Sequence, residues 1–137
     1  MLSQTAEYAL RAVLYVAQHG TDRLVQVNEM AGALRIPRNY LSKIVHALVR
    51  EGVLQSTRGK SGGFRLAVSP ERLYVVQVVS SFGAVGEERH CLLGQAQCRD
   101  RTPCAAHARW KQVADRVAEF FRETTIAELL YGAPVPA

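Results

Sequence analysis

The stretch NEMAGALRIPRNYLSKIVHALVREGVLQSTRGKSGGFRLAV, residues 28–68 of this 137-residue chain, decides the fold. It begins with a short apolar helical pattern, and after a brief turn Pro37 stands where a second helix would start. The apolar residues of this second helix recur at steps of three and four: Leu41, Ile44, Val45, Leu48 and Val49. A short helix, a turn and an amphipathic helix indicate a helix-turn-helix, whose second helix typically enters a DNA major groove.

The apolar pattern becomes strand-like after Gly52. Residues 53–57 and 64–68 are predicted to be two short strands, joined by a turn with three glycines. Arg58 and Lys60 lie in this turn, where we expect them to approach phosphates or a narrow minor groove. A hairpin of this kind beside a helix-turn-helix is a wing. The fold predicted is therefore mainly α with a small β wing.

Polar and basic residues of the second helix and the wing tip are the candidate DNA contacts. They carry donors that can reach base edges and phosphates. The candidates are Arg38, Asn39, Tyr40, Ser42 and Lys43 on the helix, and Arg58, Gly59, Lys60, Ser61, Gly62 and Gly63 on the wing. For Tyr40, a core position or a phosphate contact is as well supported as base reading.

Composition and charge place this motif in a basic, globular, cytoplasmic protein. Nine of the 17 Lys and Arg residues but only four of the 12 Asp and Glu residues fall in residues 1–70, so the net charge of +5 arises there. We expect neither a signal peptide nor a membrane span, because no apolar stretch approaches the ~18 residues that a span requires.

The wing tip imitates two catalytic motifs without meeting their requirements. Gly59-x-Ser61-x-Gly63 has the spacing of a hydrolase nucleophile elbow, but that motif leads into a helix and here a strand follows. Gly59-Lys60-Ser61 resembles the end of a P-loop, but Leu54 occupies the position of the required glycine. We therefore predict that the protein is not an enzyme.

Three cysteines and a histidine form the pattern Cys91-x6-Cys98-x5-Cys104-x2-His107, in a chain with no other cysteine. An odd number of cysteines argues against a disulfide framework and for metal ligation or redox chemistry. The gaps are wider than those of zinc knuckles and suit a larger group, such as an iron–sulfur cluster. Pro103 predicts a helix that starts at Cys104, where amide dipoles would favour a thiolate and His107 would share its face.

Periodicity predicts further elements on both sides of the motif. A helix over residues 4–18 has Ser3 as its cap, and a strand-like run covers residues 24–27. Helices are also predicted for the following ranges: 28–34, 70–82, 104–123 and 126–130. The longest of them carries an apolar seam, formed by Trp110, Val113, Ala114, Val117, Phe120 and Phe121.

A seam on a long, isolated helix predicts a partner surface, and the same helix of a second chain is the simplest candidate. A homodimer would provide two reading heads for a palindromic site, in successive major grooves about 34 Å apart. Burial of the seam against the chain's own N-terminal part is the alternative. The expected organisation is a winged helix-turn-helix domain at 1–82, a ligand loop at 83–103 and a dimerisation segment at 104–137.

Four sequence segments together resemble the iron–sulfur-dependent winged-helix repressors of bacteria, the IscR/NsrR-like family. The resemblance covers residues 1 to about 130 and rests on these segments: Tyr8-Ala9-Leu10-Arg11-Ala12, Asn39-Tyr40-Leu41-x-Lys43-Ile44, Arg58-Gly59-x-x-Gly62-Gly63, and the cysteines with His107-Ala108-x-Trp110. It implies a [2Fe-2S] cluster on Cys91, Cys98, Cys104 and His107, as in the IscR branch. The NsrR branch implies a [4Fe-4S] cluster, with Glu7 of the partner subunit as the fourth ligand.

The function expected is a DNA-binding transcriptional repressor whose affinity depends on an iron–sulfur cluster that senses iron, redox state or nitric oxide. Two alternatives remain open. A zinc-dependent or thiol-switch regulator would use the same cysteines without a cluster. A small redox or electron-transfer protein would explain the sulfurs but would leave the winged helix and the localised charge unused.

Overall fold

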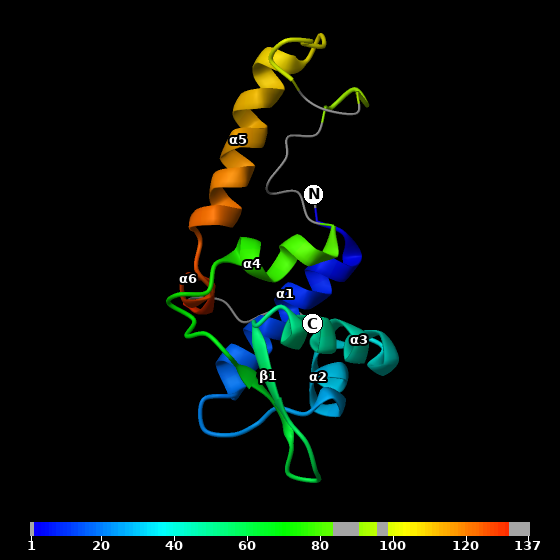
Figure 1. Ribbon diagram of the computed structural model, residues 1–137, viewed down its shortest axis with the longest axis vertical. Helices are drawn as coiled ribbons and strands as arrows, with labels where there is room; N and C mark the ends of the chain where they lie inside the picture. Colours follow the sequence, from blue (N-terminus) through cyan, green and yellow to red (C-terminus); the bar gives the residue numbers. More distant parts are fainter. Residues whose placement is uncertain (1, 84–90, 96–98, 132–137) are drawn as a thin grey trace.

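The structure is a computed structural model, and it describes residues 2–83, 91–95 and 99–131. It is mainly α with one small sheet, as the sequence predicts (Figure 1). The elements in chain order are α1 (Gln4–His19), α2 (Val27–Leu34), α3 (Arg38–Arg50), β1 (Leu54–Thr57), β2 (Gly63–Leu66), α4 (Val75–Val79), the 3-10 helix η1 (Ser80–Phe82), α5 (His107–Glu123) and α6 (Ile126–Leu130). Within the described residues, no helix combines the length and the apolarity needed to cross a membrane.

Helix α1 forms the centre of the hydrophobic core and contacts α3, α4, α6 and β2. Its small side chains let these neighbours approach closely, since Ala6, Ala9 and Ala12 are fully buried. Ser3 caps the helix as predicted, because its hydroxyl accepts a 3.1 Å hydrogen bond from the amide of Ala6. The helix ends at Gly20, whose N–H donates to the carbonyl of Val16.

The turn between α2 and α3 holds the helix-turn-helix together. Arg35 ends α2 in the left-handed region, with φ 57° and ψ 44°, and its N–H donates to the carbonyl of Ala31. The neighbouring carbonyl of Leu34 accepts a 2.6 Å hydrogen bond from the guanidinium of Arg11 on α1. Pro37 then provides the N-cap of α3. A turn anchored at both ends fixes the position of α3 against α1.

The wing is the antiparallel hairpin β1–β2, with Leu54 opposite Leu66 and Thr57 opposite Gly63. The predicted strand at residues 24–27 is reduced to a single bridge, because Val25 exchanges both backbone hydrogen bonds with Phe64 alone. Gly62 is required in the turn, since a Cβ atom there would lie 2.0 Å from the carbonyl oxygen of Thr57.

The helix predicted at residues 70–82 is wrong in its first part. Helix α4 begins only at Val75, because the preceding backbone pairs with the segment between α5 and α6. Ile126 donates to the carbonyl of Leu73, and Val75 donates to that of Thr124, at 2.7 and 2.9 Å. A backbone engaged in this long-range pairing cannot also form helical hydrogen bonds.

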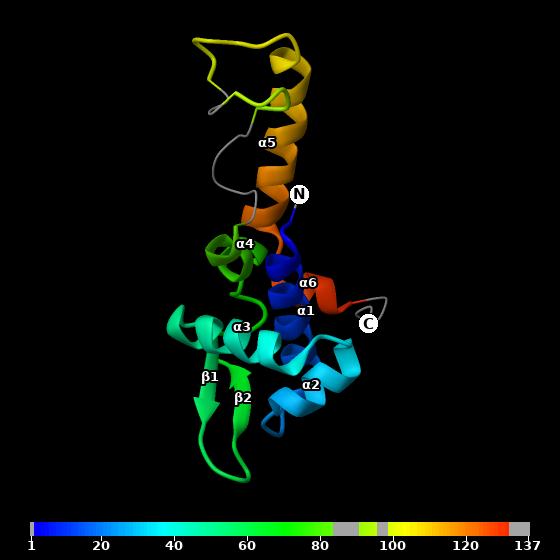
Figure 2. The same ribbon diagram turned by 90° about the vertical axis from the view of Figure 1, so that its right-hand side faces the viewer.

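Helix α5 projects away from the core, and its first turns lie at the opposite end of the long axis from the wing (Figures 1 and 2). It starts at His107, so the predicted start at Cys104 is wrong. Residues 104–106 instead form a turn, closed by a 3.1 Å hydrogen bond from the amide of His107 to the carbonyl of Cys104. Of the predicted seam, only Ala114 and Phe121 are buried.

Candidate functional site

The outer face of α3 presents four of the five residues of this helix that were predicted to meet DNA. Leu41, Ile44, Val45 and Leu48 are buried, which turns the opposite face outward. On this outward face, Arg38, Asn39 and Lys43 are exposed and Ser42 is half-buried. The structure therefore places a polar, cationic surface on the helix that a helix-turn-helix uses for reading.

A groove of about 430 Å³ separates α3 from the wing. Five predicted residues line it: Arg38, Arg58, Gly59, Gly62 and Gly63. The exposed Arg38 and Arg58 lie on opposite walls, on α3 and on the wing. A groove with a cation on each side matches the negative charge of a phosphate backbone.

Two polar residues of this groove, Gln26 and Asn28, were not predicted as DNA contacts. Gln26 and Asn28, at the start of α2, line it together with His46 of α3. Gln26 donates a 3.2 Å hydrogen bond to the carbonyl of Lys60 in the wing turn, and Asn28 accepts one from the guanidinium of Arg38. Only the packing of α2 beside the wing reveals these residues, and no sequence pattern indicates it.

His46 connects α3 to the wing. Its ring packs edge-on against Phe64 of β2, with ring centroids 5.8 Å apart, and its Nδ1 lies 2.7 Å from the carbonyl oxygen of Ser42. Phe64 is itself buried. The wing therefore has a fixed orientation relative to the recognition helix.

The remaining predicted DNA contacts lie outside the groove. None of five further candidates lines it: the exposed Asn39, Lys43, Lys60 and Ser61, and the half-buried Ser42. Tyr40 faces α1, where its hydroxyl hydrogen-bonds with that of Thr5 and its ring meets Tyr8 edge-on, 5.8 Å between centroids. These contacts give Tyr40 a role in packing α3 against α1.

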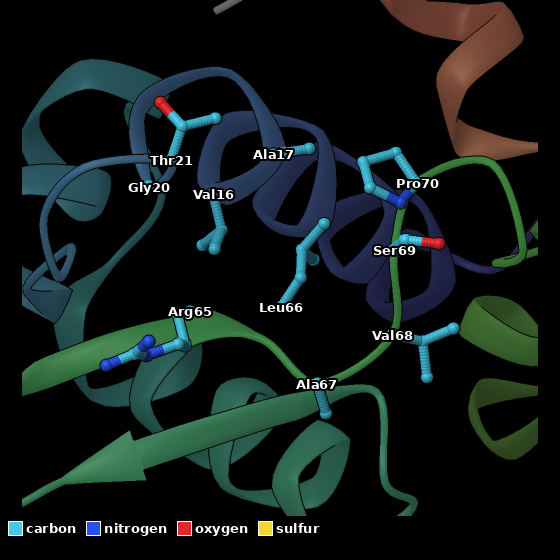
Figure 3. A pocket seen from close by; sticks show the side chains of 10 residues that line it. All are labelled: Val16, Ala17, Gly20, Thr21, Arg65, Leu66, Ala67, Val68, Ser69 and Pro70. Carbon is cyan, nitrogen blue, oxygen red and sulfur yellow. The ribbon is translucent and has the colours of Figure 1, made fainter.

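A second hollow, of about 280 Å³, lies between the end of α1 and the chain that leaves β2 (Figure 3). Leu66 points toward α1, whereas the guanidinium of Arg65 points away from the hollow. None of the predicted site residues lines it. It is therefore separate from both predicted sites.

The structure brings two of the predicted sulfur ligands together at the far end of α5. Cys91 is buried and Cys104 half-buried, and their Sγ atoms are 3.5 Å apart without a disulfide. The backbone of Gln95 donates to the Cys91 sulfur and is the largest influence lowering its pKa, supported by the amides of Leu93 and Gly94 and by the Cys104 thiol. Amides directed at a sulfur stabilise the thiolate, the form that binds metals.

His107 lies beside these sulfurs in sequence, but its ring is held by another residue. Its Nε2 is 2.9 Å from Oδ1 of Asp100, and Lys111 reaches the same oxygen at 3.1 Å. Within residues 2–83, 91–95 and 99–131, no three His, Cys, Asp or Glu side chains gather as a metal site. Cys98 lies outside the described residues, and Glu7 is exposed on α1.

Comparison with known proteins identifies the family. Residues 2–132 match the Rrf2 family, described as iron-dependent transcriptional regulator. The chain belongs to the Rrf2 family. It is 36% identical over 132 residues to a putative HTH-type transcriptional regulator of Aquifex aeolicus, covering 95% of this chain and 91% of the relative. It is 28% identical to the HTH-type transcriptional regulator IscR of Aliivibrio salmonicida, covering 94% of this chain and 76% of the relative.

Solved structures share this fold. The structure of CymR, the global cysteine regulator of B. subtilis, superposes with a TM-score of 0.77 at 20% identity, over 97% of this chain and 98% of CymR. The chain is therefore a transcriptional regulator with the winged-helix fold of the Rrf2 family.

The chemistry of the paired sulfurs fits the iron-dependence in the family's description. Two thiolates on one tetrahedral metal, each about 2.3 Å from it, would lie about 3.8 Å apart. The observed 3.5 Å is within a few tenths of an ångström of that separation. Cys91 and Cys104 could thus bind one metal atom with little movement of the backbone.

Proposed function

We propose that this Rrf2-family chain is a cytoplasmic repressor, a homodimer that binds a palindromic DNA site with an affinity controlled by an iron–sulfur cluster. The observation that carries the proposal is the 3.5 Å separation of Cys91 Sγ and Cys104 Sγ, in a regulator whose wing and α3 form a cationic groove. Cys91, Cys98, Cys104 and His107 are the proposed ligands of a [2Fe-2S] cluster. The alternative is a [4Fe-4S] cluster that takes Glu7 of the partner subunit as its fourth ligand.

DNA binding is assigned to α3 and the wing. Arg38 and Arg58 would each reach a phosphate from one wall of the groove, and the exposed backbone of Gly59 could approach a phosphate closely because no side chain intervenes. The Gly62 N–H donates to the carbonyl of Gly59, so the proposed role of Gly62 is to shape the turn. Asn39, Ser42 and Lys43 are placed to meet base edges in the major groove. Lys60 and Ser61 would contribute further backbone contacts from the wing tip.

The proposed dimer forms through α5. Val113 and Phe120 keep 52% and 50% of their surface exposed, although both belong to the apolar seam. Apolar exposure of this extent on one projecting helix favours a partner helix. Two copies would present two α3 helices, as a palindromic site requires.

Communication between the two sites is proposed to pass through this dimer. The described part of the loop before α5 and the wing lie at opposite ends of the long axis, so this loop is remote from the wing of its own chain (Figures 1 and 2). Ligation of residues 91–107 would set how α5 meets its partner and therefore the spacing of the two heads. Iron shortage would lead to loss of the cluster, whereas oxidants or nitric oxide would attack it. Either event would release that constraint.

The test is the iron and sulfide content of protein purified without air. Two irons per chain would favour His107 as the fourth ligand, and four would favour Glu7. Cys91→Ala and Cys104→Ala should each abolish cluster retention, whereas the exposed Ser81 offers a matched control in Ser81→Ala. Colourless wild-type protein after reconstitution with iron and sulfide would contradict the cluster.

The same sulfur pair supports a second candidate, a thiol switch without a cluster. At 3.5 Å, the Cys91 and Cys104 thiols can be oxidised by a peroxide to a disulfide, which forms one S–S bond, breaks the peroxide O–O bond and yields two waters. Mass analysis of metal-free protein after peroxide would show the loss of two hydrogens and a Cys91–Cys104 cross-linked peptide. A zinc-dependent regulator would instead retain one colourless metal ion per site.

Salt dependence separates both candidates from a small redox protein. A protein that neutralises several phosphates loses affinity steeply as salt rises, with a logarithmic slope of about −0.9 per phosphate contact. The proposed groove and wing predict several such contacts in each half-site. Binding to promoter DNA that is weak and insensitive to salt would favour the redox protein.

A further inference from the structure

We infer that Asn28, at the start of α2, is a positioning residue for DNA binding, because its side-chain oxygen holds Arg38 so that the two terminal guanidinium nitrogens can grip one phosphate. Both residues line the groove between α3 and the wing, and Oδ1 of Asn28 accepts a hydrogen bond from Nε of Arg38. The two residues are 10 positions apart, and no pattern in the sequence joins them. The inference rests on the proposed function, because it refines how this groove holds DNA.

The first step is the chemistry of the contact. The Nε–H of an arginine can only donate, so the atom of Asn28 that meets it must be the amide oxygen. With Nε engaged, the donors that remain on the guanidinium are those of Nη1 and Nη2. The edge that these two nitrogens form suits two oxygens of one phosphate. The contact therefore selects the edge of Arg38 that meets the ligand.

The second step is the charge of the groove. Among the described residues that line it, none carries a carboxylate. Asn28 holds Arg38 through a neutral amide, so this contact does not offset the positive charge of the guanidinium. An aspartate at position 28 would hold the guanidinium more strongly but would offset the charge that attracts a phosphate. An amide positions the arginine and leaves it cationic.

The third step is the place of Arg38 on α3. It is the first residue of this helix, where the amide dipoles oppose a positive charge. Pro37, the N-cap, provides no side-chain hydrogen bond, and the first turn has no acidic residue. The helix itself therefore does not favour a cation at this position. An anion that met both the guanidinium and the start of the helix would favour it.

The fourth step is the opposite wall of the groove. Gln26, two residues before Asn28, donates a 3.2 Å hydrogen bond to the carbonyl of Lys60 in the wing turn. The start of α2 thus contacts both α3 and the wing. Asn28 therefore positions Arg38 relative to a wing that is held from the same part of α2.

The first experiment needs no DNA. In the full chain, NMR should show that the Nε–H of Arg38 exchanges with water about fivefold more slowly than in Asn28→Ala, the effect of one modest hydrogen bond. Asn28→Asp keeps an acceptor oxygen and should retain slow exchange. The exposed Gln18, an amide outside the groove, provides the matched control in Gln18→Ala. Equal exchange in the wild type and Asn28→Ala would overturn the inference.

The second experiment measures affinity for a DNA duplex that the wild-type chain selects from a random-sequence library. Asn28→Ala should weaken binding by about threefold to tenfold. Asn28→Asp should weaken it further and make the salt slope shallower by about 0.9, because the carboxylate offsets one cation that meets a phosphate. Gln18→Glu adds the same charge outside the groove and should leave the slope unchanged. A contact that only joins α2 to α3 would tolerate aspartate, so full affinity in Asn28→Asp would overturn the inference.

A failure of the proposed function would give a different result. If Arg38→Ala binds the selected duplex as tightly as the wild type, the groove is not the DNA site, and the inference fails with that assignment. If Arg38→Ala weakens binding and Asn28→Ala does not, the inference alone fails.

A double-mutant cycle tests whether Asn28 acts through Arg38. In an Arg38→Ala background, Asn28→Ala should cause no further loss of affinity, because the residue that it positions is gone. The same loss in that background would reject the positioning role. Single base-pair substitutions in the duplex should affect the wild type and Arg38→Ala alike, as a phosphate contact requires. Discrimination lost at one base pair in Arg38→Ala would show that Arg38 reads a base and would overturn the phosphate assignment.

Discussion

The two ends of the molecule are built on different principles. At the wing end, the recognition helix buries four apolar residues, the strands pair in register, and Phe64 and His46 join wing to helix. At the sulfur end, the described loop leaves Leu92 and Leu93 57% and 61% exposed, and Cys91 is its one buried residue among 91–95 and 99–103. The winged helix keeps its shape through its own core, and the exposed apolar residues of the sulfur end are consistent with the proposed ligand or partner there.

The largest expected effect concerns the proposed dimer interface on α5. Val113→Glu places a charge in the exposed part of the α5 seam, where a buried carboxylate would oppose dimerisation. We expect a monomer with an intact fold and a DNA affinity lower by about a hundredfold or more, because the second head no longer adds avidity. Sedimentation velocity and DNA titration would measure both.

The exposed Gln112 beside it offers the control, since Gln112→Glu adds the same charge off the seam. Equal losses in the two variants would contradict a specific α5 interface. A dimer that persists in Val113→Glu would place the interface elsewhere. It would then no longer follow that this end of the molecule needs a partner.

The second prediction tests the rigidity of the wing. Gly62→Ala forces a Cβ atom to within 2.0 Å of the Thr57 carbonyl oxygen, so the hairpin turn must open. We expect a loss of about 2–3 kcal/mol in stability and weaker DNA binding. Chemical denaturation would measure the first and titration the second.

Gly59→Ala is the matched control in the same turn. Unlike Gly62, Gly59 has a positive φ, 108°, and a Cβ atom there would meet open space. Its expected cost is only the conformational strain, about 1 kcal/mol. If both variants lose the same stability, the nearby Thr57 carbonyl oxygen is not the reason why position 62 requires glycine.

The third prediction concerns an ion pair that ties α2 to α1 and to the loop between them. Glu29 accepts from both guanidinium nitrogens of Arg23, at 2.7 and 2.8 Å, and from the hydroxyl of Tyr15. The hydrogen bonds from Arg23 lower the pKa of Glu29 from 4.5 to about 2. The lowered pKa means that this stabilisation is complete above pH 4.5 and is lost as the pH falls toward 2.

Glu29→Gln should therefore lower the free energy of unfolding at neutral pH by about 1–2 kcal/mol, a value reduced for solvent screening because the Arg23 side chain is half exposed. It should also flatten the acid side of the stability profile, measured by urea unfolding at several pH values. The exposed Glu51, replaced by Gln, controls for the change in net charge. A steep acid profile that survives in Glu29→Gln would contradict the assignment.

The contrast between the two ends also explains what the sequence could predict. Core residues such as Leu41 and Leu48 recur with the helical period, so the helix-turn-helix follows from local pattern. The start of α4 does not follow from local pattern, because Leu73 pairs with Ile126 from the far end of the chain. Cys91 and Cys104 were predicted as neighbours from their residue types, and the structure places their sulfurs together.

The helix start predicted at Cys104 failed, because Pro103 is compatible with a turn as well as with a helix. The contacts of Asp100 with His107 and Lys111 had no local signal, since an exposed carboxylate in a loop is common. In this protein, the residues that complete each site are the ones contributed by a second element of structure. Asn28 at the groove illustrates the same rule.

The smallest expected effect is a change in the salt dependence of DNA binding, without any change at the sulfur end. Arg58→Ala removes one cation from the wing wall of the groove while leaving the sulfur end untouched. We expect a modest loss of affinity, about threefold to tenfold, and a salt slope that is shallower by about 0.9 for each lost phosphate contact. The exposed Arg122, at the end of α5, provides the matched control in Arg122→Ala, which should leave the slope unchanged. Because iron content should be identical in both variants, a fall in cluster retention with Arg58→Ala would mean that the wing and the sulfurs are coupled more directly than their separation suggests.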